Sequence, residues 1–160
     1  MENYIIKHEK SGVNYHRVYS FLKKMDQHMN PVLSSRVCIE EYAWKLAEKA
    51  DIFYAVYAGT DCGHCAVYMN AGEKAYITSF GVLPEFQGNG IANVLMEAVL
   101  LEAAARGIKT IGLEVCTNNK AALCLYCKFG FRISREKEGF FRMDKEIATQ
   151  ISGSAAVKIK

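Results

Sequence analysis

The sequence contains no apolar run that approaches the roughly 20 residues that a membrane-spanning helix needs. Its opening residues, MENYIIKHEK, also lack the apolar core of a secretory signal peptide. These two absences argue against a membrane protein and against export. We therefore expect a cytoplasmic protein that has no membrane partner.

An excess of charge of either sign is missing too. Lys and Arg together number 20 and Asp and Glu 17, so the formal net charge at pH 7 is only +3. The basic residues are scattered rather than gathered into the patch or stripe that is typical of nucleic-acid binding. Nucleic acid is therefore not an expected partner, although the mild positive balance suits a small ligand that carries phosphate.

Internal repeats, low-complexity tracts and linker-like segments are absent as well, which favours one domain. A chain of 160 residues, of which 51% are hydrophobic, is long enough to bury about 70% of the surface that its unfolded form exposes. We expect a single domain over residues 1–147. The remaining stretch, 148–160, reads ATQISGSAAVKIK, and its small and polar composition predicts a mobile tail.

Cysteine is present but lacks the spacing of a metal site. The chain has six cysteines, and two Cys-x-x-Cys pairs begin at Cys62 and Cys124. Zinc-binding halves usually stand roughly 15 to 20 residues apart, whereas these two are much farther apart and the second falls within a helical pattern. We expect no metal and interpret the cysteines as reduced thiols that act as small apolar residues. A zinc-organised interaction module stays open as a lesser alternative.

Apolar residues recur at helical or strand spacing along most of the chain. Helices are expected from Tyr15 to just before the segment MNPV, and at 39–50, 91–105 and 118–129. Strands are expected at 3–7, 51–59, 65–70, 75–83, 109–115, 131–134 and 139–147. The segment TDCGH, 60–64, is expected to be the turn between the second and third strands.

This order predicts an α/β domain of the α+β type. A central mixed, mostly antiparallel sheet of about seven strands is flanked by four helices. Because helix 91–105 crosses between strands 75–83 and 109–115, those two strands should be parallel neighbours in the middle of the sheet. The loop QGNGIA, 87–92, then lies between the carboxyl end of a strand and the amino end of a helix.

A loop in that position can bind an anion. The first amides of a helix have no partner within the helix, and their dipoles favour negative charge. Gly88, Gly90 and Ala92 keep large side chains clear of these amides. The loop matches neither the Walker A sequence nor G-x-G-x-x-G, so a tight strand-to-helix turn is the alternative that these residues alone leave open.

Two longer segments resemble one family. The first, GVLPEFQGNGIANVLM, resembles the Q/R-x-x-G-x-G/A signature of the GNAT superfamily of N-acetyltransferases, with Gln87, Gly90 and Ala92 at its fixed positions. The second, LEVCTNNKAALCLYCKFGF, resembles a later motif of that family, and of its ribosomal-protein amino-terminal acetyltransferase branch. The residues that match it are Leu113, Glu114, Val115, Asn119, Leu125, Tyr126, Gly130 and Phe131.

The resemblance implies that acetyl-CoA is the co-substrate. Its pyrophosphate is expected on the main-chain amides of the loop, and its pantetheine arm beside the preceding strand, which should splay from its parallel neighbour. A bulge is expected near Gly81. The implied cofactor-binding residues are Phe80, Gly81, Val82, Gln87, Gly88, Asn89, Gly90, Ile91, Ala92, Asn93 and Asn119.

The resemblance also implies two catalytic residues. Tyr126 matches the usual acid, which donates a proton to the leaving thiolate, and Glu114 matches a carboxylate that accepts the proton of the amine. Without the motif, Tyr126 would be interpreted as a core residue and Glu114 as a solvated carboxylate. A covalent route through cysteine lacks a histidine at a recognisable spacing. His8, His16 and His28 are expected on the surface or on a helix face.

The acceptor is left open among small amines, amino sugars and peptide amino termini. The family builds this site from the first two helices and the last hairpin, which here contain Tyr15, Tyr19, Arg36, Phe140, Phe141 and Arg142. A homodimer is left open as well. The alternative to an N-acetyltransferase is a non-catalytic acyl-CoA sensor that keeps the loop but does not need Tyr126 or Glu114.

Overall fold

A computed structural model describes residues 4–12 and 14–148. The predicted tail, apart from residue 148, lies outside the described residues. Short 3₁₀ turns occur at Asp26–His28, Leu33–Ser35 and Pro84–Phe86. The other elements are β1 (Tyr4–Glu9), α1 (Tyr15–Met25), α2 (Ile39–Lys49), β2 (Asp51–Tyr57), β3 (Thr60–Tyr68), β4 (Lys74–Val82), α3 (Ile91–Ala105), β5 (Thr110–Cys116), α4 (Lys120–Lys128), β6 (Arg132–Lys137) and β7 (Phe140–Glu146).

The strands form one seven-stranded sheet in the order β1-β2-β3-β4-β5-β7-β6. Every neighbouring pair is antiparallel except β4 and β5, which are parallel. The predicted fold class is therefore confirmed, including the central parallel pair. Within the described part of the chain, no helix is both long enough and apolar enough to cross a bilayer.

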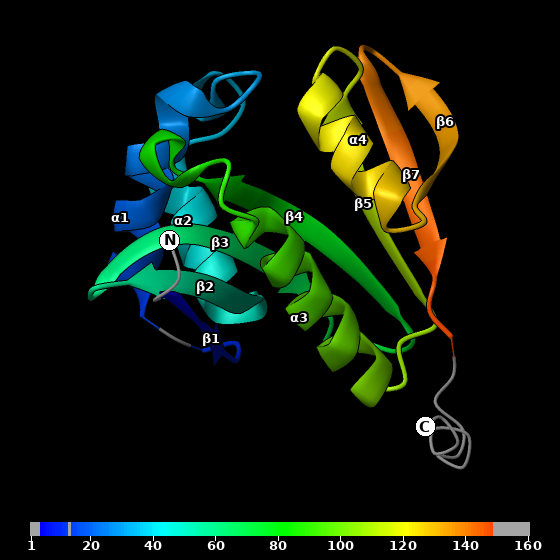
Figure 1. Ribbon diagram of the computed structural model, residues 1–160, viewed down its shortest axis with the longest axis horizontal. Helices are drawn as coiled ribbons and strands as arrows, with labels where there is room; N and C mark the ends of the chain where they lie inside the picture. Colours follow the sequence, from blue (N-terminus) through cyan, green and yellow to red (C-terminus); the bar gives the residue numbers. More distant parts are fainter. Residues whose placement is uncertain (1–3, 13, 149–160) are drawn as a thin grey trace.

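The helices cover both faces of the sheet. One buried cluster joins α1 and α2 to β2 through residues such as Leu22, Leu46 and Ile52. A second cluster on the other face includes Leu95 and Met96 of α3 and Tyr126 of α4. Figure 1 shows α3 beside the half of the sheet that contains β2 to β4, and α4 beside the half that contains β5 to β7.

The two central strands separate after a short stretch of pairing. Only Lys74–Tyr76 of β4 pair with Thr110–Gly112 of β5. Beyond that point β4 continues to pair with β3, and β5 with β7, so the sheet opens into the two arms visible in Figure 1. The loop 87–92 follows the open end of β4.

The bulge in β4 is not at Gly81. The register with β3 shifts between Ile77 and Ser79, so the extra residue is Thr78. Gly81 meets a different constraint, because a Cβ there would come within 2.6 Å of the Met25 Cε of α1. The prediction was wrong because a glycine in a strand marks either a bulge or a close approach, and here it allows the close approach of α1.

The turn between β2 and β3 was also misplaced. The chain reverses at Ala58 and Gly59, whose φ angles are 49° and 77°, and TDCGH is the beginning of β3. Two consecutive left-handed residues form the tight hairpin turn that matches strand twist. The Asp and Gly of TDCGH suggested a turn, but its Cys62 and His64 side chains are buried within the sheet layers.

His8 is not the isolated surface residue that was expected. Its Nε2 lies 2.6 Å from Oδ2 of the buried Asp51, and its ring stacks on Phe53 with 4.2 Å between centroids. Arg106, at the end of α3, pairs with the same carboxylate. The buried Asp51 carboxylate thus has two side-chain partners, which tie β1 and the end of α3 to the start of β2. His16 and His28 are exposed, as predicted.

His64 is a buried, neutral histidine in the layer beneath α1. It is 1% exposed, its Nε2 lies 2.7 Å from the Ser79 Oγ, and Phe21 packs against the ring. Burial lowers the pKa of His64 to about 3 because the protonated ring would lose its hydration. In the unfolded chain the same imidazole takes up a proton near pH 6.5.

This difference predicts that acid weakens the fold before most carboxylates titrate. Below pH 6.5 the unfolded state binds a proton that the folded state does not, so His64 lowers the free energy of unfolding by about 1.4 kcal/mol per pH unit until its folded pKa is reached. Urea denaturation at pH 6.5 and pH 5 should therefore show a loss of about 2 kcal/mol. The variant His64→Gln should show a much smaller loss of unfolding free energy between these two pH values. If its loss equals that of the parent protein, His64 is not the cause of the acid destabilisation.

Candidate active site

The connection between β4 and α3 contains two exposed glycines, which leave part of its main chain uncovered by side chains. Gly88 and Gly90 have φ angles of 82° and 77°, in the left-handed region that glycine adopts without strain. A Cβ built on either glycine would meet nothing within 4 Å. The loop therefore borders open space, and its glycines serve the backbone conformation and leave that space clear.

Side chains of the loop hold it against the end of β4. The Gln87 Nε2 donates to the Val82 carbonyl at 2.9 Å. The Asn89 Nδ2 donates to the Phe86 carbonyl at 3.2 Å and to the Gln87 carbonyl at 3.3 Å. These contacts fix the loop from within.

The first turn of α3 has amides available for an anion. The helix begins directly after Gly90, and the first main-chain bond of the helix runs from the Val94 amide to the Gly90 carbonyl at 3.2 Å. Ile91, Ala92 and Asn93 precede that bond, and the first turn contains no acidic residue. The positive end of the helix dipole is therefore uncompensated by a side chain in this turn.

Lys128 adds a cation at this end of α3, which sequence reasoning missed. Its Nζ donates to the Asn93 Oδ1 at 2.9 Å, so the last residue of α4 reaches the first turn of α3. The contact joins residues 35 positions apart across the opening between the two arms of the sheet. A lysine at the end of a helix has no motif of its own, and only the packing of α4 reveals its place.

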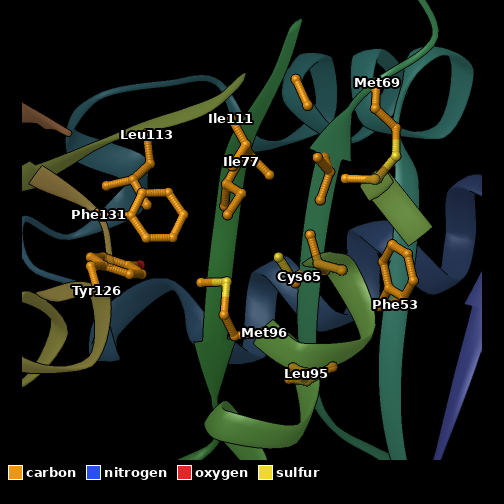
Figure 2. Close-up of a cluster of buried hydrophobic side chains, with 14 of the residues drawn as sticks. Phe53, Cys65, Met69, Ile77, Leu95, Met96, Ile111, Leu113, Tyr126 and Phe131 are labelled. Carbon is orange, nitrogen blue, oxygen red and sulfur yellow. The ribbon is translucent and has the colours of Figure 1, made fainter. Parts of the chain in front are cut away.

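Tyr126 lies on α4 in a hydrophobic surrounding. Its ring makes edge contacts with Phe80 of β4 and Phe131, with centroid separations of 6.1 and 5.8 Å. Figure 2 shows the Tyr126 ring extending toward β4 in the same cluster as Met96. The residue is 7% exposed, and burial raises its pKa above the ordinary value of a tyrosine. The phenol, which is protonated at neutral pH even at the ordinary pKa of tyrosine, therefore stays protonated over a wider pH range.

The Tyr126 hydroxyl differs from other tyrosine hydroxyls of the core. Among the described residues, those of Tyr54 and Tyr68 are fully buried without a hydrogen-bond partner, whereas that of Tyr126 does not belong to this group. No protein group in the described part of the chain accepts or donates a hydrogen bond at it either. The Tyr126 hydroxyl is therefore not fully buried and has no hydrogen-bond partner among the described residues.

Glu114 lies on the opposite face of the sheet from Tyr126. Alternation along β5 directs Leu113 and Val115 into the cluster that contains Tyr126, and Glu114 away from it. Glu114 is exposed and lines a cavity of about 370 Å³. The two predicted catalytic residues therefore flank β5 from its two faces, beside the stretch where β4 and β5 have separated.

The cavity beside Glu114 contains three of the residues predicted for the acceptor site. Its lining also includes Arg135, Lys137 and Glu138 of the last hairpin, which the prediction had included only as a segment. Tyr15 and Tyr19 are instead stacked with each other on α1, next to Trp44. The full lining consists of Arg36, Glu114, Arg135, Lys137, Glu138, Phe140 and Arg142.

Two other predicted features stay separate from this arrangement. The Asn119 Oδ1 accepts from the Ala122 amide at 3.2 Å and caps α4, which gives Asn119 a structural role in the free protein. Cys62 and Cys65 are buried on β3, whereas Cys124 and Cys127 are exposed on α4. Within residues 4–12 and 14–148, no three His, Cys, Asp or Glu side chains converge as metal ligands would.

Comparison with known sequences gives one family. A sequence model described as the acetyltransferase (GNAT) family matches residues 15–131. The [ribosomal protein bS18]-alanine N-acetyltransferase of Salmonella typhimurium is 32% identical over 69 residues, 43% of this chain and 47% of that protein. The thialysine N-epsilon-acetyltransferase of Sus scrofa is 32% identical over 84 residues, 51% of this chain and 49% of that protein. The chain thus spans about half the length of the curated relatives it matches.

Solved structures share the fold at low identity. Ard1 from Thermoplasma volcanium superposes with a TM-score of 0.74 and 18% identity, over 91% of this chain and 98% of that one. The PaiA N-acetyltransferase of Thermoplasma acidophilum, solved in complex with coenzyme A, gives a TM-score of 0.69 and 16% identity, over 89% and 99% of the two chains. The similarity extends over nearly the whole length of both structures.

Proposed function

The chain belongs to the acetyltransferase (GNAT) family, and we propose that it transfers the acetyl group of acetyl-CoA directly to a primary amine. The observation that carries the proposal is the placement of a buried phenol beside the splayed strands, next to a glycine loop whose amides are free to bind an anion. A strand-to-helix turn that binds no ligand would not need both a buried phenol beside the splayed strands and a loop with free amides.

The loop fits the phosphates of acetyl-CoA. The main-chain amides from Gly88 to Asn93 would hold the pyrophosphate, since the space in front of Gly88 and Gly90 is open and the first turn of α3 has no acidic side chain. Lys128 would add a positive charge at the same helix end. Gln87 would keep the loop in place through its contact with the Val82 carbonyl.

The end of β4 fits the pantetheine arm. Phe80, Gly81 and Val82 continue to pair with β3, but β5 no longer covers their other edge. An extended amide chain can pair with such an edge as an added strand would. This position would direct the thioester toward Tyr126, which already contacts Phe80.

The reaction requires two protons to leave the protonated acceptor nitrogen and one proton to reach the sulfur. Glu114 would accept a proton from the ammonium group, directly or through water, because an alkylamine with a pKa near 10 is mostly protonated at neutral pH. The amine nitrogen then forms a bond to the acetyl carbon, the carbon–sulfur bond breaks, and the nitrogen releases its second proton to solvent. Tyr126 would donate its proton to the departing sulfur, because its phenol is protonated at neutral pH.

A thiol-release assay tests this function. Purified protein would be mixed with acetyl-CoA and a panel of primary amines and short peptides, and free coenzyme A would be measured with a thiol reagent, with the acetylated product identified by mass spectrometry. We expect amine-dependent release. Tight binding of acetyl-CoA without release from any amine would favour the acyl-CoA sensor instead.

A further inference from the structure

A row of charged side chains crosses the last three strands of the sheet. Glu114 of β5 pairs in register with Arg142 of β7, and Arg142 with Arg135 of β6. Residues that are directly opposite in neighbouring strands project from the same face. All three line the cavity of about 370 Å³ described above.

A local irregularity creates the pairing of the two arginines. The register of β6 against β7 shifts between Ile133 and Arg135, so Ser134 is the extra residue. The Ser134 hydroxyl donates to the Arg142 carbonyl at 3.3 Å. Without this bulge Ser134 would be the residue opposite Arg142, and Arg135 would project from the other face of the sheet.

Arg142 is held in place over β5. Its guanidinium bonds to the Asp144 Oδ1 from Nε at 3.1 Å, and it packs on the Tyr76 ring at 5.3 Å from the centroid. Gly112 makes this possible, because a Cβ at that position would collide with the guanidinium and with Asp144. The arginine therefore has a defined position beside Glu114.

Like charges that face each other across neighbouring strands destabilise a sheet, so the opposition of Arg135 and Arg142 needs a compensating reason. Of the four basic residues that line the cavity, Arg142 pairs with the Asp144 carboxylate. The other three, Arg36, Arg135 and Lys137, form no ion pair within the described part of the chain. The lining contains four cations and two carboxylates, a formal net charge of +2. An anion bound between these cations would remove the repulsion.

We propose that the acceptor is an amine that also carries an anionic group, a carboxylate or a phosphate, and that Arg135 and Arg142 with Arg36 bind that group while Glu114 receives the amine. The inference rests on the proposed acetyl transfer and specifies its substrate class. Guanidinium groups suit both anions because their planar donors pair with two oxygens at once. A cavity of about 370 Å³ is near the lower end of ligand pockets, which fits a compact molecule.

The same lining disfavours a polyamine. A second ammonium group would lie among four cations with only Glu114 and Glu138 as carboxylates. Phe140, whose ring lies 5.5 Å from the Arg36 guanidinium, adds no formal charge to the lining. The lining would therefore attract amines that carry an anionic group and repel amines that carry a second cationic group.

Matched acceptors test the inference. The panel consists of β-alanine, ethanolamine phosphate, propylamine and 1,3-diaminopropane, together with the amidated dipeptides Ala-Glu, Ala-Gln and Ala-Lys. We expect the acidic members to have kcat/KM values at least tenfold above their neutral counterparts, with the diamine and Ala-Lys lowest. The first two compounds separate a preference for carboxylate from one for phosphate.

Two single variants locate the effect. In Arg135→Gln the ratio of kcat/KM for the acidic acceptor to that for the neutral one should fall about tenfold, as expected when a charge-assisted hydrogen bond is lost. Arg132→Gln makes the same change on an exposed residue of the same strand that does not line the cavity, and its ratio should match the parent. Both side chains are exposed, so folding should be retained.

The outcomes separate the two proposals. Acetyl transfer that is equally efficient to neutral or cationic amines would overturn the anionic-acceptor inference while the proposed function stands. Equal loss of the acidic preference in Arg132→Gln would overturn it as well, since the effect would then follow overall charge. Failure of acetyl transfer to every amine would instead refute the proposed function.

Discussion

Replacing Tyr126 with Phe is expected to lower kcat by about 10²- to 10⁴-fold, the range for loss of a general acid, with little change in the Kd of acetyl-CoA. The edge contacts of the ring with Phe80 and Phe131 do not involve the hydroxyl, so the packing of α4 should be preserved. Stopped-flow or steady-state thiol release gives kcat, and calorimetric titration with acetyl-CoA gives the Kd. A fall in kcat together with weaker binding of acetyl-CoA would mean that Tyr126 supports binding rather than proton transfer.

A matched control removes the same atom elsewhere. Tyr68→Phe deletes a hydroxyl that is buried without a partner on β3, near the α2 cluster, and should leave kcat within about twofold of the parent. Activity of Tyr126→Phe equal to that of Tyr68→Phe would mean that a group other than Tyr126 supplies the proton. The raised pKa of Tyr126 adds a second expectation. An acid is active below its pKa. At pH values up to about 10, we therefore expect no fall in kcat from deprotonation of this phenol.

Replacing Gly90 with Asp is expected to weaken coenzyme A binding by at least 100-fold, whereas Gly90→Asn should weaken it by only about tenfold. Asn and Asp tolerate left-handed backbone better than other residues, so both variants should fold at a φ of 77°. The two side chains have nearly the same shape, but only Asp places a negative charge beside the pyrophosphate. At an effective dielectric constant near 20, two charges about 4 Å apart interact with about 4 kcal/mol.

Isothermal titration with coenzyme A measures both variants, and circular dichroism checks their folding. The difference between Asn and Asp isolates charge from the conformational cost of replacing glycine. Equal affinities for the two variants would place the phosphates away from this loop. Such a result would also remove the principal observation behind the proposed function, whatever the activity of Tyr126→Phe.

Local patterns in the sequence specify most of the fold. Helix α3 was predicted at 91–105 and occupies Ile91–Ala105, because Gly90 precedes an almost uninterrupted apolar segment that ends near Gly107. The parallel pairing of β4 and β5 followed from the crossover helix between them. Errors occurred where tertiary contacts decide the outcome. Gly81 accommodates Met25 from another element, and no pattern within β4 announces that contact.

The candidate site was predictable only where a motif fixes the spacing. The loop from Gln87 to Asn93 and the position of Tyr126 follow from such motifs. The cluster of basic side chains beside Glu114 does not follow from a motif, since Arg135 faces Arg142 only because Ser134 forms a bulge. A shift of one residue in the register would reverse every side chain beyond it, and the sequence of β6 does not reveal the shift. Lys128 was missed for a similar reason, because its contact with Asn93 depends on how α4 packs.

The parallel seam between β4 and β5 consists of only three residue pairs. Past these pairs, the facing edges of the two strands have no partner strand, in the middle of a sheet where such edges are normally paired. Water can solvate the main-chain groups of these edges when no ligand is bound. An extended ligand with its own amides can replace that water without breaking any bond within the protein. The short seam therefore lets the fold admit an extended molecule through its centre while the outer strands keep their pairing.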